Sequence, residues 1–178
     1  MENYEQQVMN AGRVLRHHTN SLPETEDLAQ HSWGMGLLTH LLYQEAGMDV
    51  SRELLLACLA HDLGEAVTGD LPYAVKHRAP NTATELRKLE NEWLKEHLVW
   101  TEITAEEVVA LKFVDYLQLG YYCLRQQALG VRTEHLSVMT INVNSLLTQW
   151  MEKFETPSLQ DAAINFKLRL METIRELG

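Results

Sequence analysis

The chain has 178 residues, 46% of them hydrophobic, and is therefore long enough to fold as one compact domain, residues 1–178, around a single core. Its net charge of −10 opposes binding to a nucleic-acid backbone, so we expect no nucleic-acid polymer as a partner. The N-terminus lacks a secretory signal and no run approaches the roughly 20 apolar residues of a membrane span, so we expect a cytoplasmic protein without membrane contact.

Apolar residues recur at helical spacing along the chain, and no alternating pattern indicates a strand. The first half predicts three helices, over about residues 8–15, 32–46 and 54–67. Gly47 is placed to end the second helix, because glycine is the residue that most often follows a helix C-terminus. Ser51 is placed to cap the third. The sequence therefore predicts an all-α protein from its first segments onward.

The second half continues this pattern after a turn at residues 69–72. Thr104 and Glu107 form a capping box, the sequence signature of a helix start. Cys58 and Cys123 lie within apolar helical patterns, so we expect core thiols rather than a disulfide or a metal pair. Further helices, the first beginning at Asn81 or Thr82, are expected over residues 82–98, 106–124, 133–154 and 158–177.

Two histidines and two aspartates, His31, His61, Asp62 and Asp115, form the most informative pattern in the chain. They fall on three different predicted helices, which could converge on one point. Two imidazoles and two carboxylates can hold one divalent ion while leaving positions open for water and a substrate oxygen. Each residue alone would be interpreted as a packed histidine or a capping carboxylate. All four in this order favour a metal site suited to hydrolysis.

This pattern resembles the HD-domain phosphohydrolases, which are all-helical metal enzymes acting on phosphate esters. The stretch from His61 to Pro72 is similar to the bacterial 5′-deoxynucleotidase branch, where H-D-x-x-E-x-x-x-G-D follows an N-terminal arginine. The whole set is most similar to the phage dATP triphosphohydrolases of the DatZ type. The resemblance covers residues 11–124, and the helices of residues 133–178 add only helical pattern. The further segments that carry it are residues 11–19, 31–34, Lys76 and 111–115.

Glu65 and Asp70 are the predicted catalytic carboxylates. Glu65 lies four residues after His61 and three after Asp62, so on a helix it would share their side and reach a water near the ion. Asp70 follows the turn and could orient that water or a ligating histidine. The resemblance implies acid, base and orienting roles for this pair. The structural alternatives are a solvated carboxylate for Glu65 and a helix cap for Asp70.

Arg16, Lys76 and Lys112 are the predicted phosphate-binding residues. A guanidinium binds phosphate oxygens in a fork, and lysines act as mobile positive charges. Lys112 lies one helical turn before Asp115, which directs it toward the predicted site. By similarity with the dATP enzymes, the three residues would hold a triphosphate. The alternative for the lysines is that they only solvate an acidic surface.

Thr19 and Trp33, with His17 and His18, lie where the resembling enzymes build their pocket for base and sugar. An aromatic residue next to a ligand could stack on a base or limit the size of the pocket. For Trp33, packing in the core is the favoured alternative. The nucleotidase branch usually carries a tryptophan directly after its N-terminal arginine, whereas this chain has His17.

These residues and the resemblance to the dATP triphosphohydrolases lead us to expect that a water activated by the ion attacks the α-phosphorus of dATP, giving deoxyadenosine and triphosphate. Two lysines favour the triphosphate over a monophosphate. The alternatives are a 5′-deoxynucleotidase acting on deoxynucleoside monophosphates, or a noncatalytic HD module that only binds nucleotides. Intact Glu65 and Asp70 argue against the noncatalytic module.

The cofactor expected from these ligands is one divalent transition metal, Zn, Co or Mn, and Mg could accompany the triphosphate. His77 and His97 form no recognisable second metal pair, so one tightly bound ion is expected. The resemblance also implies a homo-oligomer, a hexamer or a dimer. The amphipathic last helix, together with Trp150 and Phe154, could supply its interface.

Overall fold

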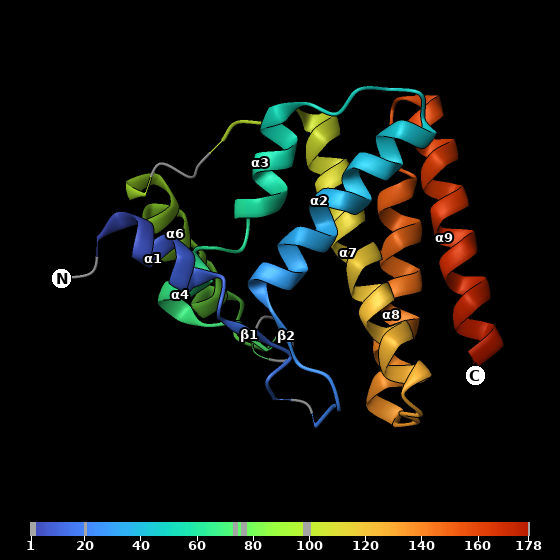
Figure 1. The fold of residues 1–178 in the computed structure, drawn as a ribbon, viewed down its shortest axis with the longest axis horizontal. Coiled ribbons are helices and arrows are strands. Elements are labelled where there is room, and N and C mark those ends of the chain that lie inside the picture. The colour runs from blue at the N-terminus through green and yellow to red at the C-terminus, as the bar shows by residue number, and fades with distance from the viewer. Residues whose placement is uncertain (1–2, 20, 73–74, 76–77, 98–100, 178) are drawn as a thin grey trace. The chain divides into compact units, whose positions relative to one another are not determined.

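The computed structural model describes residues 3–19, 21–72, 75, 78–97 and 101–177, and it confirms the predicted all-α class (Figure 1). The chain forms two compact units. The first unit consists of Met1–Trp33 and Leu56–Glu102, and the second of Gly34–Leu55 and Ile103–Gly178. The expectation of one domain therefore stays a prediction. Within the described part of the chain, we find no helix with the length and hydropathy needed to cross a bilayer.

The first unit combines short helices with a small antiparallel ladder. Helix α1 (Tyr4–Ala11) leads into strands β1 (Leu15–Arg16) and β2 (Glu26–Asp27), and β2 opens directly into helix α2 (Leu28–Glu45). Helix α4 (Glu65–Thr68) packs against both α1 and helix α6 (Pro80–Glu96). The expectation of no strands was wrong here, because two residues per strand are too few to show an alternating pattern. The ladder aligns Arg16 with Glu26.

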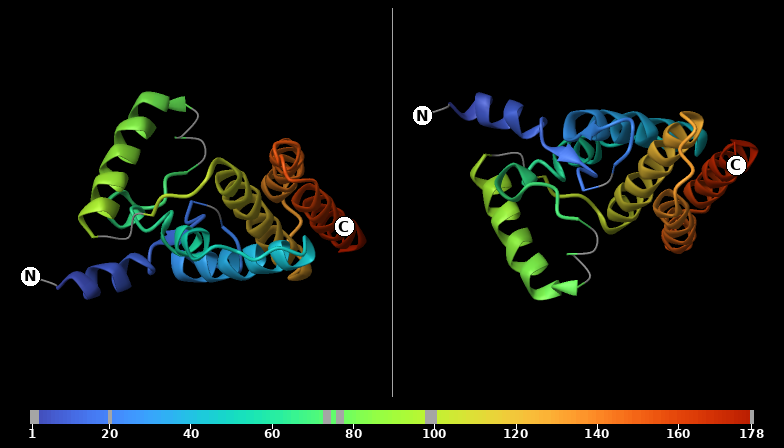
Figure 2. Two further views of the ribbon diagram at one scale, coloured as in Figure 1. Left: turned by 90° about the horizontal axis from the view of Figure 1, so that it is seen from above. Right: turned by 90° about the horizontal axis from the view of Figure 1, so that it is seen from below.

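The second unit is built on three long helices that lie side by side in all views (Figures 1 and 2). They are α7 (Ala105–Ala128), α8 (Glu134–Met151) and α9 (Pro157–Leu177). Their apolar stripes face one another, as the helical spacing predicts. The largest fully buried side chains contributed by these helices are Phe113, Leu117, Leu136, Leu147, Leu159, Leu170 and Gln126.

Two helix starts in the second unit are joined by one carboxylate. The Ser51 hydroxyl caps helix α3 (Arg52–Ala60) by accepting a hydrogen bond from the Leu54 amide at 2.9 Å, and it donates to the Glu107 carboxylate. Glu107 also forms the capping box of α7 with Thr104. Burial raises the pKa of Glu107, but hydrogen bonds from Ser51 and Thr104 lower it to a net value below its ordinary range. Both predicted caps are confirmed.

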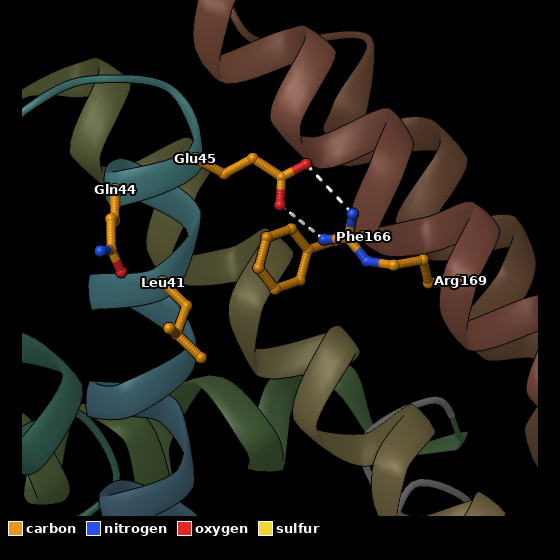
Figure 3. Close-up of a pocket in the computed structure, with 5 residues that line it drawn as sticks. All are labelled: Leu41, Gln44, Glu45, Phe166 and Arg169. Carbon is orange, nitrogen blue, oxygen red and sulfur yellow. Dashed lines mark hydrogen bonds and ion pairs between the residues drawn. The ribbon is translucent and has the colours of Figure 1, made fainter.

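A surface pocket lies between α2 and α9 in the second unit (Figure 3). The Arg169 guanidinium donates two hydrogen bonds to Glu45, of 3.1 and 2.6 Å, and lies over the ring of Phe166. This pairing holds the pKa of Glu45 below its ordinary range. Leu41 and Gln44 complete the lining. None of the predicted site residues lines this pocket.

The predicted helix over residues 54–67 is interrupted at the segment that contains His61 and Asp62, which corrects the expectation of one continuous helix. Helix α3 ends at Ala60, and α4 begins only at Glu65. The residues between them form turns in which the amides of Leu63 and Glu65 donate to the carbonyls three residues earlier, at Ala60 and Asp62, at 3.0 and 2.9 Å. Apolar periodicity does not detect this break, since a tight turn keeps residues three apart on one side.

Gly64 permits this tight turn to lie against α6. A Cβ at Gly64 would meet both the Cβ and the carbonyl oxygen of Glu90 at 2.7 Å. Gly64 has an ordinary right-handed backbone, so close approach rather than conformational freedom requires glycine here. Helix α6 itself begins at Pro80, earlier than the predicted Asn81 or Thr82, because proline is well suited to the first helical position.

Replacing Gly64 with alanine is expected to lower the free energy of unfolding by about 1–3 kcal/mol, because the added methyl group would overlap the α6 backbone. Gly36→Ala on α2 is the matched control, since a Cβ there meets no heavy atom within 4 Å. Alanine at position 36 should leave the free energy of unfolding unchanged or raise it by up to about 1 kcal/mol. Urea unfolding followed by circular dichroism measures both changes. Equal stability of the two variants would contradict the close approach at Gly64.

Ser51→Ala is expected to lower the free energy of unfolding by about 1–2 kcal/mol near neutral pH, because the cap of α3 and the donor to Glu107 are both lost. The pKa of Glu107 is lowered in the folded state, so its carboxylate stabilises the fold above its unfolded-state pKa. That contribution disappears as the pH falls through the folded-state pKa. The stability difference between Ser51→Ala and the unchanged protein should therefore narrow in acid. Thermal unfolding of both proteins from neutral to acidic pH tests this expectation. A stability difference that stays constant with pH would contradict it.

Candidate metal centre

His31, His61 and Asp62 form a compact group of metal-binding side chains in the first unit. The Nε2 atoms of the two histidines are 3.4 Å apart. The Asp62 Oδ2 atom lies 3.2 Å from Nε2 of His61 and 3.7 Å from Nε2 of His31. His31 is fully buried in the first turn of α2, and the other two residues lie in the turn after α3. The structure thus brings together three of the four predicted ligands.

The spacing of these three atoms fits one divalent ion. A tetrahedral ion with bonds of about 2.1 Å to nitrogen and oxygen separates its ligands by roughly 3.4 Å. The three measured separations, 3.2, 3.4 and 3.7 Å, bracket that value. Two nitrogens and one carboxylate oxygen suit zinc, cobalt or manganese better than calcium or magnesium, which prefer oxygen alone.

Both histidines turn the same ring nitrogen toward this group. While Nε2 faces the group, Nδ1 of His61 lies 3.1 Å from the backbone carbonyl oxygen of Cys58. Nδ1 of His31 lies 4.0 Å from the carboxylate of Glu26. An acceptor beside Nδ1 favours the proton on that nitrogen and leaves the Nε2 lone pair available for a metal. Both rings are therefore oriented as ligands would be.

Arg16 approaches the group from β1. Its Nη1 atom donates to Oδ2 of Asp62 at 2.6 Å, and its Nε atom lies 3.5 Å from Glu26. Burial raises the pKa of Asp62, but His61, Arg16 and His31 lower it more, so the net pKa is well below its ordinary range. Asp62 is thus an anion near neutral pH, the form that binds a cation. Arg16, predicted to bind phosphate, also pairs with a predicted ligand.

Glu26 is the residue at this centre that sequence reasoning missed. Only 3% of it is exposed, and it lies opposite Arg16 in the ladder and beside His31. A single glutamate in a polar stretch has no periodic signal that marks it as buried. Its place five residues before a predicted ligand histidine was the one available hint.

The two predicted catalytic carboxylates lie in the same unit. Glu65 is the first residue of α4, and it is 6% exposed, so the solvated alternative is wrong for it. Asp70 accepts a hydrogen bond from the backbone amide of His17 at 3.0 Å. His17 has a left-handed backbone, with φ of 55°. Asp70 therefore holds the chain directly after Arg16.

Asp115 and Lys112 lie on α7 in the second unit, one helical turn apart as predicted. The Lys112 ammonium is 3.4 Å from Oδ2 of Asp115. Both side chains are partly exposed, at 39% and 19%. Their assignment as phosphate-binding residue and fourth ligand stays a prediction. Lys76 and His77 fall outside the described residues.

The two residues predicted to line a pocket for base and sugar, Thr19 and Trp33, are both exposed. Trp33 is 67% exposed, so packing of this residue in the core was a wrong interpretation. Its place on α2, two residues after His31, points it into solvent although its neighbours Ser32 and Met35 are buried. Thr19 is exposed. A substrate contact by either residue stays a prediction.

The other histidines are placed in ordinary roles. His97 stacks on the ring of Trp93 with ring centroids 3.9 Å apart, and its Nε2 lies 2.5 Å from Oε1 of Gln7. His40 and His135 are exposed. Among the described residues, these three histidines take no part in the metal-binding group.

Comparison with known proteins places this centre in a family. A family model described as an HD domain matches residues 12–111, more than half of the chain. A 5′-deoxynucleotidase of Photorhabdus laumondii is 28% identical over an alignment of 134 residues, which covers 64% of this chain and 68% of the relative. A 5′-deoxynucleotidase of Photorhabdus temperata is 26% identical over an alignment of 126 residues, which covers 60% of this chain and 64% of the relative.

Two solved structures share the fold. The cyanophage S-2L HD phosphohydrolase DatZ, bound to dA and one catalytic Zn²⁺ ion, has a TM-score of 0.71 and 20% identity, covering 99% of this chain and 98% of its own. An HD-domain phosphohydrolase from Listeria innocua has a TM-score of 0.74 and 16% identity, covering 97% and 91%. The chain therefore belongs to the HD-domain family, and it has the helical fold of the HD phosphohydrolases.

Proposed function

We propose that this protein is a metal-dependent phosphohydrolase that converts dATP and water into deoxyadenosine and triphosphate. The observation that carries the proposal is the group formed by His31, His61 and Asp62, whose donor atoms are separated by the distances that one transition ion requires. A buried imidazole pair beside an anionic carboxylate has no comparable use in packing alone, since polar groups are costly to bury.

His31, His61 and Asp62 would hold the ion, and from the motif we add Asp115 as the fourth ligand. When bound, a Zn²⁺, Co²⁺ or Mn²⁺ ion lowers the pKa of a coordinated water and polarises the phosphoryl oxygen under attack. The anionic state of Asp62 supports this assignment, because the lowered pKa keeps its carboxylate ready for a cation.

The chain's own residues would then transfer protons and bind the phosphate oxygens. Water oxygen forms a bond to the α-phosphorus, and the bond from phosphorus to O5′ of the deoxynucleoside breaks. Glu65 would accept the proton from the attacking water and return one to the departing O5′. Arg16 would bind phosphate oxygens, and Asp70 would keep the segment of Arg16 in place through the His17 amide.

The choice of a triphosphate over a monophosphate rests on charge, and the choice of deoxyadenosine rests on similarity. Arg16, Lys76 and Lys112 carry more positive charge than a monophosphate needs, and DatZ, with the same fold, has been solved with dA. The second candidate, a 5′-deoxynucleotidase acting on monophosphates, is favoured by the names of the two Photorhabdus relatives. The chemical step is the same for both substrates, since the attacked phosphorus and the leaving oxygen are shared. A homo-oligomer and Mg²⁺ on the triphosphate stay predictions.

Incubation with dATP is expected to give deoxyadenosine and triphosphate in equal amounts, read by chromatography and ³¹P NMR. Asp62→Asn should lower turnover by at least about 10²-fold and reduce the bound metal measured by mass spectrometry, because it removes an anionic ligand. Asp161→Asn, the same change at an exposed site on α9, is the control. Phosphate from dAMP without turnover of dATP would favour the monophosphate enzyme. Nucleotide binding without any product would contradict both.

Lys112→Ala is expected to lower kcat/KM for dATP by about 10- to 100-fold, because a charged hydrogen bond to phosphate contributes roughly 1.5–3 kcal/mol. The same variant should change kcat/KM for dAMP much less, if Lys112 contacts the outer phosphates. Steady-state kinetics on both substrates measure this, with metal content checked because Lys112 pairs with Asp115. Lys88→Ala, at an exposed ion pair with Glu85, is the control. An equal loss on both substrates would contradict a role in holding a triphosphate.

A further inference from the structure

We propose that Glu26 is a positioning residue of the metal centre, whose buried carboxylate orients His31 for metal binding and fixes Arg16 beside it. The inference rests on the proposed metal-dependent function. It adds a residue that lies outside the histidine and aspartate motif. Glu26 touches neither the predicted ion nor a substrate in this assignment, and it acts through its two neighbours.

The first argument is burial. Glu26 is 3% exposed, and a carboxylate removed from water is stable only beside positive charge or hydrogen-bond donors. Arg16 supplies such charge, with its Nε atom 3.5 Å from Oε2 of Glu26. A buried ion pair often adds no net stability compared with apolar residues of similar volume, so a need for stability alone does not account for the pair of Glu26 and Arg16. The location of this carboxylate therefore calls for a role at the centre.

The second argument is the backbone. In the ladder between β1 and β2, Arg16 and Glu26 are direct partners. Residues opposite one another in an antiparallel pair have Cβ atoms about 5 Å apart, which lets a glutamate reach the guanidinium. Strand β2 continues directly into α2, whose first turn carries His31. One short ladder thus brings Glu26 to both of its neighbours.

The third argument is the orientation of His31. Its Nε2 atom faces His61 and Asp62, and its Nδ1 atom faces Glu26 at 4.0 Å. This separation is longer than a hydrogen bond, so Glu26 acts on the ring through its negative charge, which is strong in a buried place. That charge favours the proton on Nδ1, which would leave the Nε2 lone pair available to an ion held together with His61 and Asp62. Cys58 does the same for His61 through its carbonyl oxygen.

The fourth argument is that two different carboxylates hold Arg16. The guanidinium is held at Nη1 by Asp62 and at Nε by Glu26. If Asp62 turns its charge to an ion, Glu26 remains as the anion that keeps Arg16 at the centre. Loss of the Glu26 charge should therefore affect the metal and the phosphate-binding residue together.

The test compares Glu26→Gln, which keeps the shape and removes the charge, with Glu26→Asp, which keeps the charge. Glu92→Gln, the same chemical change at an exposed site of α6, is the matched control. Zn²⁺ and Co²⁺ affinity are measured by competition with a chromophoric chelator, without any nucleotide. We expect about 10- to 100-fold weaker binding for Glu26→Gln, a change of a few-fold at most for Glu26→Asp, and none for Glu92→Gln. Equal affinity in Glu26→Gln and the unchanged protein would overturn the proposal, as would equal loss in the Gln and Asp variants.

A second readout does not depend on metal affinity. Imidazole ¹⁵N shifts in the unchanged, metal-free protein should show His31 with its proton on Nδ1, and a proton on Nε2 would overturn the proposal. In Glu26→Gln, the fraction with the proton on Nδ1 should fall, whereas a purely structural role for Glu26 would leave it unchanged. Failure of the unchanged protein to bind Zn²⁺ or Co²⁺ would instead contradict the proposed function. The two failures are therefore distinguishable.

Discussion

The polar centre of the first unit depends on the balance between two carboxylates and one guanidinium. Asp62 and Glu26 contribute two negative charges, and Arg16 contributes one positive charge, with two histidines between them. The carboxylates outnumber the guanidinium by one, and all three side chains are largely buried. Such a centre would favour a cation, because an excess of buried negative charge is costly. The same imbalance would oppose an anionic phosphate until a cation is present.

The backbone that holds these groups is made of short, locally specified pieces. Two residues of ladder align Arg16 with Glu26, and a tight turn after α3 carries His61 and Asp62. The turn can lie against α6 because residue 64 has no side chain. Neither piece buries much apolar surface by itself. These pieces set the positions of the side chains at the centre.

The sequence alone was sufficient to predict a residue's role where its type and its neighbours in the chain indicate one structural role. Ser51, Thr104 and Glu107 cap helices as predicted, and His31, His61 and Asp62 come together as the motif indicates.

Sequence reasoning failed at positions where tertiary contacts decide the local structure or the burial of a side chain. The apolar run after Leu54 did not reveal the end of α3, because periodicity continues through a tight turn. Trp33 was interpreted as core from its residue type, although its place on α2 exposes it. Glu26 carries no local signal at all, since its burial is set by partners ten residues before and five after it.

His17 shows how one departure from the nucleotidase pattern has a physical reason in this chain. Its φ of 55° is left-handed, which is unfavourable for a residue with a side chain, and histidine is among the residues found there more often than most. The His17 amide donates to Asp70, which offsets part of this cost. Bulky aromatic residues are poorly suited to such a backbone, so the tryptophan usual after the arginine would be strained here. The direction of Arg16 is therefore set by a kinked backbone on one side and by Glu26 across the ladder on the other.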